Sequence, residues 1–187
     1  MMRVRALGAV LLVAAATTGC GYNQIQTKDE AVNKAKGNIE TQLQRRVDLI
    51  PNLVETVKGA AAQETTVFNG IAASRAKLSG AIQSGDVAQM AQANAAVRSD
   101  LGRLLAIVEN YPTLKSSEAF RQLQDQLEGT ENRIQVARQD YNATVNDFNA
   151  YVRQFPINLT AKIFGLDKPR PYFEAEAGAQ EVPKVKF

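Results

Sequence analysis

The fold is decided by residues 120–155, FRQLQDQLEGTENRIQVARQDYNATVNDFNAYVRQF, in which apolar side chains recur every three or four positions. Residues spaced in this way lie on one face of an α-helix, whereas a half-buried strand would alternate at every second residue. Ser116-Ser117-Glu118 is a capping sequence at the start, and Pro156 ends the helix. The series skips one layer at Thr130 and Glu131, a polar interruption that either fixes helix register inside a bundle or lies at its edge. The face comprises Phe120, Leu123, Leu127, Ile134, Ala137, Tyr141, Val145, Phe148, Val152 and Phe155.

The same spacing predicts a second helix over residues 86–110, preceded by the break and cap Ser84-Gly85-Asp86 and ended by Tyr111-Pro112. Its apolar face comprises Val87, Met90, Ala93/Asn94, Val97, Leu101, Leu104, Leu105 and Val108.

Residues 28–78 keep a helical face but contain Pro51. Proline lacks an amide N–H and disfavours a helical conformation in the residue before it. Either Asp48–Pro51 is a tight turn in which Asp48 caps a new helix, or one long helix kinks there. Helix lengths favour the turn. The face comprises Val32, Ala35, Ile39, Leu43, Val47, Ile50, Val54, Val57, Ala61, Phe68, Ile71 and Leu78.

The predicted fold is therefore all-α, an antiparallel four-helix bundle of long helices over residues 28–156 with an extended C-terminal strap. The tail, residues 157–187, contains three of the six prolines. Within it, Ile157–Phe164 can form one or two helical turns, ended by Gly165. We expect the tail to pack on the bundle; the alternative is an arm that orders when it binds a partner.

The N-terminus has the pattern of an export signal. Residues 1–19 contain Arg3 and Arg5, then the uncharged, mostly apolar stretch 6–16, which is too short to span a membrane as a helix. Thr18-Gly19-Cys20 resembles the bacterial lipoprotein signal, with Thr17 where Leu is usual. We expect a cleaved signal peptide, a lipidated Cys20 and a short linker over residues 20–27. An unlipidated product or an uncleaved anchor is the alternative.

Composition excludes several chemistries. The chain of 187 residues contains no His, no Trp and one Cys. It therefore has no His-based general base, no Ser-His-Asp or Cys-His nucleophile, no His-ligated metal and no internal disulfide. Removal of Arg3 and Arg5 with the signal lowers the formal net charge from +3 to +1, which is no signature of nucleic-acid binding.

Residues 44–59, QRRVDLIPNLVETVKG, resemble the signature of the LemA family. The tail segments Phe155-Pro156, Phe164-Gly165, Tyr172-Phe173-Glu174 and Val182-Pro183-Lys184-Val185 resemble its C-terminal pattern. The resemblance implies an α-helical bundle outside the cytoplasmic membrane, held by an N-terminal anchor, with no established catalytic activity. Many relatives have an uncleaved transmembrane helix, and some are associated with envelope and magnetosome membranes. By similarity to enterobacterial lipoproteins, Gly21 after Cys20 favours the outer membrane.

A polar cluster in this signature is the candidate docking site for an acidic partner or for lipid headgroups, because guanidinium groups bind carboxylates and phosphates. The alternative is structural, with Asp48 capping a helix and the arginines pairing nearby. The carboxylates Glu128, Glu131, Asp140 and Asp147 are expected on a solvated face. The docking candidates are Arg45, Arg46, Asp48, Asn52, Glu55 and Lys58.

The predicted function is a non-enzymatic scaffold or interaction module of a bacterial cell envelope, with an unidentified envelope protein as partner. No catalytic residue, metal site or cofactor is predicted. The alternatives are an enzyme or small-ligand carrier that uses polar groups in the bundle core, and direct binding to a lipid surface through Arg45, Arg46 and Lys58.

Overall fold

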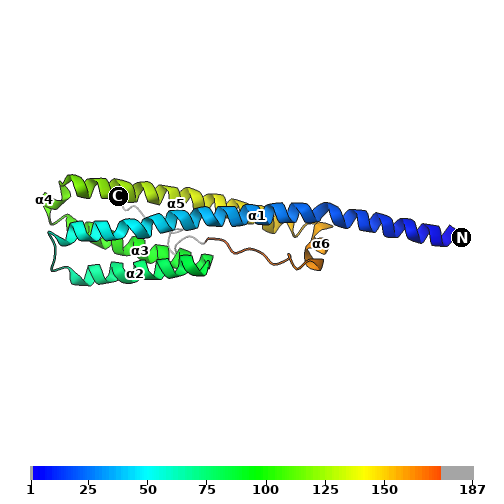
Figure 1. Ribbon diagram of the computed structural model, residues 1–187, viewed down its shortest axis with the longest axis horizontal. Coiled ribbons are helices and arrows are strands. Elements are labelled where there is room, and N and C mark those ends of the chain that lie inside the picture. The colour runs from blue at the N-terminus through cyan, green and yellow to red at the C-terminus, as the bar shows by residue number, and fades with distance from the viewer. Residues whose placement is uncertain (1, 174–187) are drawn as a thin grey trace, which may run out of the picture. The chain divides into compact units, whose positions relative to one another are not determined.

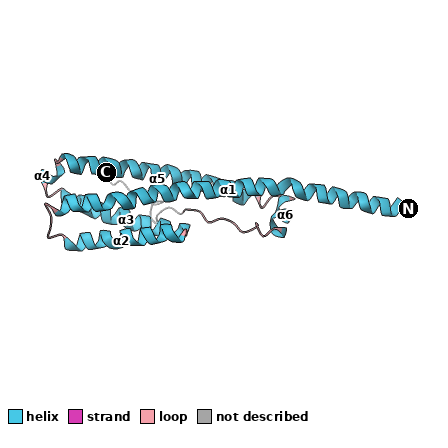
Figure 2. Ribbon diagram, in the orientation of Figure 1, coloured by secondary structure: helices cyan, strands magenta, loops and turns pink. Residues whose placement is uncertain are grey.

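The computed structural model describes the backbone of residues 2–173 and the side chains of residues 21–173 (Figure 1). This part of the chain is all-helical, as Figure 2 shows, and contains no strand. The prediction of an all-α bundle is confirmed. The helices are α1 (Met2–Lys58), α2 (Thr65–Ser84), α3 (Val87–Val108), α4 (Pro112–Lys115), α5 (Glu118–Tyr151) and α6 (Ile157–Ile163).

The chain divides into two compact units. Unit 1 pairs the N-terminal part of α1, through Gly37, with Asp140–Pro171, and so includes the C-terminal part of α5 and all of α6. Unit 2 is formed chiefly by Asn38–Gln139: the rest of α1, then α2, α3, α4 and the first part of α5. Within unit 2, successive long helices run in opposite directions (Figure 1).

Helix α1 continues through Pro51, so the turn predicted at Asp48–Pro51 is wrong. A proline inside a helix leaves the carbonyl four residues earlier without its usual N–H donor. Here that carbonyl belongs to Val47, and Arg75 Nε of α2 donates a hydrogen bond of 2.9 Å to it. Helix α1 ends instead at Lys58, and residues 59–64 lead to α2. Four long helices remain, with the first connection later in the chain than predicted.

The connections that follow match their sequence signals. Gly85 adopts φ 65°, a left-handed conformation that glycine tolerates at the end of α2. Asp86 then caps α3, because its Oδ1 accepts hydrogen bonds from the amides of Ala88 and Gln89 at 2.9 and 3.1 Å. Ser117 caps α5 in the same way, accepting from the amide of Phe120 at 3.3 Å.

Most of the predicted apolar positions are buried, and the exceptions are informative. In α1 the face rotates so that Leu53 is buried, while Val54 is only half-buried. Ala35, Leu123 and Leu127 are also half-buried, and Leu105 is exposed. Phe155 is the largest departure, at 81% exposed, because α5 ends at Tyr151 and the face no longer continues.

Helix α6 and the residues that follow it through Pro171 belong to unit 1. The short helix predicted over Ile157–Phe164 forms as α6, and Gly165 follows with φ 68°. After α6, the backbone of Arg170 is held by the Asn149 side chain of α5. This side chain accepts a hydrogen bond from the Arg170 amide at 2.7 Å and donates one to the Arg170 carbonyl at 3.0 Å. The strap over the bundle stays a prediction, because residues 174–187 lie outside the described part.

Candidate functional site

The most buried charge of unit 2 lies in the family-like segment. Arg46 is only 2% exposed, and its guanidinium donates hydrogen bonds to Asn94 of α3 and to Glu131 of α5. Arg98 of α3 approaches the other Glu131 oxygen, with Nε 3.5 Å from Oε1. One buried arginine therefore joins three helices. Its Nε is buried and lacks a hydrogen-bond partner within the described residues.

Burial sets the electrostatics of this cluster. It lowers the pKa of Arg46 to about 10, and the positive charge of Arg98 contributes to the same decrease. Arg46 thus stays protonated at neutral pH. Two guanidinium groups, those of Arg46 and Arg98, thus face the Glu131 carboxylate.

The cluster acts as a structural connection. Thr130, beside Glu131, is fully buried, and its hydroxyl donates to the Gln126 carbonyl at 2.7 Å. The polar interruption of α5 therefore lies inside unit 2 and not at an edge. A buried charge with specific partners favours one register of the three helices, since any slip would leave it unpaired. Arg46 is directed away from the surface where a docking partner would bind.

The neighbouring candidates face outward. Arg45 and Asp48 line an open groove of about 610 Å³ between α1 and α2. Gln44 Nε2 donates to Asp48 Oδ1 at 2.8 Å, and Ile82 of α2 contributes an apolar wall. The groove thus offers charges of both signs, one side-chain amide and one apolar side chain. Its lining is completed by Glu40 and Thr41.

The remaining docking candidates, Asn52, Glu55 and Lys58, are exposed on the last turns of α1 and do not line that groove. The Lys58 ammonium lies 5.6 Å from the centroid of the Phe68 ring, a cation–π distance. The six predicted residues therefore do not form one site. Arg46 is a buried connection, Arg45 and Asp48 line the groove, and the other three form a separate exposed set. Docking at the exposed ones stays a prediction.

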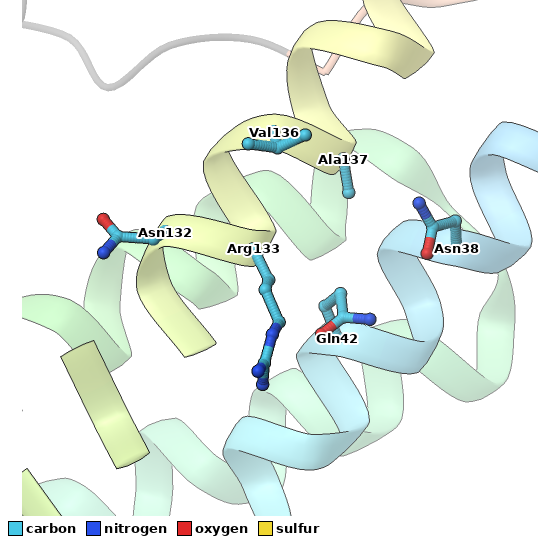
Figure 3. Close-up of a pocket in the computed structure, with 6 residues that line it drawn as sticks. All are labelled: Asn38, Gln42, Asn132, Arg133, Val136 and Ala137. Atoms are coloured by element: carbon cyan, nitrogen blue, oxygen red, sulfur yellow. The ribbon is translucent and has the colours of Figure 1, made fainter. Parts of the chain in front are cut away.

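A second hollow of about 360 Å³ lies between α1 and α5 within unit 2 (Figure 3). Asn38 and Gln42 of α1 face Arg133 of α5, whereas Val136 points away from them (Figure 3). The Gln42 Oε1 atom is buried without a hydrogen-bond partner in the described residues. Amides and one guanidinium can hold a small polar group, but this lining has no carboxylate to form an acid–base pair.

The carboxylates of α5 lie mostly where the sequence predicts. Glu128, Asp140 and Asp147 are exposed, whereas Glu131 is wrongly placed among the solvated ones, because it pairs with Arg46. Among the described residues, no group of three or more His, Cys, Asp or Glu side chains is arranged to hold a metal ion.

The predicted lipid attachment at Cys20 stays a prediction. Its backbone lies within α1, and its side chain is outside the described part. Across the described residues, none of the helices combines the length and apolar character needed to span a membrane.

The predictions from sequence missed Asn94, Glu131 and Arg75 as partners in these contacts, although two of the three positions carry a signal. Asn94 lies in the apolar series of α3, and Glu131 stands where α5 skips a layer; both positions signal a buried polar contact. Arg75 carries no such signal, because an arginine on a polar helix face is normally solvated.

The fold and these sites define a helical-bundle protein with a buried polar connection and an open groove at its surface. The model of the LemA family matches residues 35–187, and the chain belongs to this family. Two relatives are Magnetosome protein MamQ 1 and Magnetosome protein MamQ 2 of Paramagnetospirillum magneticum. Each is 29% identical over 203 residues, covering 95% of this chain and 73% of the relative. Magnetosome protein MamQ of Magnetospirillum gryphiswaldense is 27% identical over 197 residues, covering 92% and 72%.

Proposed function

We propose that this protein is a non-enzymatic scaffold of a bacterial cell envelope, tethered to a membrane through a lipidated Cys20, with its bundle outside the cytoplasm. Membership of the LemA family supports the helical scaffold, and relatives named as magnetosome proteins support association with a membrane structure. The lipoprotein-like sequence before Cys20 supports the type of anchor. The partner is another envelope protein.

The observation that carries the scaffold role is the division of the family-like segment into an inner and an outer set. Arg46 connects three helices inside unit 2, while Arg45 and Asp48 line the groove with Ile82. A rigid inner connection fixes the positions of the outer side chains. Mixed charge beside an apolar wall suits a protein segment better than an anionic lipid surface, which attracts basic groups.

Site-specific crosslinking of the full chain in its native envelope tests this role. A photoreactive residue replaces Gln44 at the groove, and the matched control replaces Gln135, another exposed glutamine, on α5. We expect one adduct of defined mass from position 44, and none from position 135. Arg45→Glu should reduce that adduct, because it reverses one charge of the groove. No specific adduct from position 44, or equal adducts from both positions, would contradict the proposal.

The structure weakens the alternative of direct lipid binding by this segment. Arg46 is buried, so two of the three basic groups invoked for lipid contact remain at the surface, Arg45 and Lys58. Flotation with vesicles of zwitterionic and anionic lipid separates the two functions. Binding through these residues would increase with anionic lipid and fall with salt, and Arg45→Glu with Lys58→Glu would abolish that dependence.

A further inference from the structure

Unit 1 exposes an apolar patch at α6. We call this the α6 patch and define it by Phe155, Leu159, Ile163 and Phe164, which are 81%, 53%, 70% and 56% exposed. Leu159 and Ile163 are four residues apart and so lie on the same side of the helix. Single exposed apolar residues are ordinary, but four within ten residues of sequence indicate a surface that contacts something apolar.

The patch is fixed beside the N-terminal segment. A Cβ atom built on Gly21 would lie 2.5 Å from Ile157 Cδ1, so α6 packs directly on the α1 backbone there. Tyr22 packs against Phe164, with ring centroids 4.6 Å apart. Figure 1 shows α6 alongside this part of α1. These contacts are one and two residues after Cys20.

The same contacts lie close to the apolar stretch 6–16. Helix α1 includes these residues, and at about 1.5 Å per residue Gly21 lies about 8 Å along the axis from residue 16. A lipid on Cys20 and an uncleaved apolar helix would therefore both bring α6 to the membrane surface. The packing also gives Gly21 a role besides the sorting preference suggested by its sequence position.

The charges around the patch suit a bilayer. Three basic residues, Arg153, Lys162 and Lys168, are exposed within a few positions of the patch in the sequence. One acidic residue in the same stretch, Asp167, is exposed. Apolar side chains flanked by basic ones are the pattern of segments that lie in the membrane interface, where the bases meet anionic headgroups.

We propose that the α6 patch inserts into the membrane interface and forms a second contact, beside the N-terminal anchor, that orients the protein on the bilayer. This inference rests on the proposed membrane tether. One tether alone leaves a protein free to tilt, whereas a second contact on the same unit restricts its orientation.

The natural chain contains no Trp, so a single introduced Trp reports on one position. We would place it at Phe164 or Leu159 in the full-length protein, purified with its native N-terminus and reconstituted in vesicles of phosphatidylcholine and phosphatidylglycerol with brominated acyl chains. Val136→Trp is the matched control, because Val136 is also 56% exposed but belongs to unit 2 and not to the α6 patch. Circular dichroism verifies that each variant is helical.

We expect bromine to quench most of the fluorescence at positions 164 and 159 and little at position 136. Ile163→Asp should reduce quenching at 159 at least twofold. Vesicle flotation without quenching at either position would overturn the α6 contact and leave the tether intact. Loss of flotation would overturn both. A blue-shifted but unquenched Trp would also overturn the contact, since the patch would then be covered by protein, either the C-terminal tail or a second copy.

Discussion

Arg75 Nε donates a hydrogen bond of 2.9 Å to the carbonyl oxygen of Val47, the carbonyl that Pro51 leaves without its helical donor. Arg75 lies on α2, so a contact between helices replaces a hydrogen bond missing within α1. This explains how α1 continues through a proline. It also joins α2 to α1 at Val47, one helical turn before Pro51.

Replacement of Arg75 should therefore depend on Pro51. We expect Arg75→Met to lower the free energy of unfolding by about 1.5–3 kcal/mol, the range for a hydrogen bond from a charged group. Pro51→Ala restores the amide donor to Val47 and should raise stability, because alanine favours a helix interior. In the Pro51→Ala background the loss caused by Arg75→Met should become much smaller. Urea unfolding of the four proteins measures this coupling, and an equal loss in both backgrounds would contradict it.

The buried pair makes a second prediction. Glu131→Ala leaves the Arg46 charge unpaired, and we expect a loss of about 3 kcal/mol, the lower end for a buried pair because Glu131 remains partly solvated. Arg46→Met combined with Glu131→Leu should recover most of that loss, since an apolar pair leaves no buried charge. Thermal unfolding measures both changes.

An exposed ion pair provides the control for this comparison. Arg103 and Asp100 approach to 3.5 Å, with the Arg103 side chain 71% exposed, so Arg103→Met should change stability little. If Arg46→Met combined with Glu131→Leu is as unstable as Glu131→Ala, an unpaired buried charge is not the cause of the lost stability.

The third prediction concerns alkaline pH. Burial raises the pKa of Tyr141 above its usual value near 10, and nearby Arg170 opposes this in part. A pKa raised in the folded state gives stability that is complete below pH 10 and lost as pH rises through the folded pKa. The Tyr141 hydroxyl also donates to the Pro171 carbonyl at 2.8 Å. Hence the melting temperature of the natural protein should fall more steeply above pH 10 than that of Tyr141→Phe.

Arg46 makes a contribution of opposite sign to the pH dependence of stability, which increases stability as pH rises in this range. Its lowered pKa makes the folded state release the proton at a lower pH than the unfolded state does. That effect is common to both proteins and cancels in their difference. Parallel melting curves from pH 8 to pH 11.5 would exclude the Tyr141 contribution.

The pair of hydrogen bonds between Asn149 and Arg170 makes a fourth prediction. The Asn149 side chain binds both the amide and the carbonyl of residue 170. Asn149→Ala should increase hydrogen exchange of the Arg170 amide at least tenfold. Asn149→Asp keeps the acceptor and should preserve more protection. Exchange that is unchanged in both variants would show that the Asn149 side chain does not protect this amide.

Sequence periodicity predicts the long helices well, because each apolar face is a local property of one segment. That α1 continues through Pro51 is not predictable in this way. The donor that compensates the Val47 carbonyl, Arg75, is 28 residues from Val47 and on another helix. Phe155 fits the period of α5 but lies beyond its end, so a helical pattern alone overextends the core.

The candidate site shows the same limit. Arg46 has the sequence context of a surface residue, and its partners Asn94 and Glu131 lie 48 and 85 residues away. The sequence marks each of those partners as a polar residue in an apolar series. It does not indicate that both of them contact Arg46. The groove residues Arg45 and Asp48 were predictable as exposed neighbours, whereas the contribution of Ile82 required the packing of α2 on α1.

The central claim is a membrane tether at Cys20, and its most direct test is the mass of the N-terminal peptide from protein extracted from native membranes. We predict a peptide that begins at Cys20 and carries a diacylglyceryl group, with or without an amide-linked acyl chain. An intact N-terminus at Met1 or Met2 with an unmodified Cys20 would contradict the lipoprotein anchor and indicate an uncleaved N-terminal helix in its place.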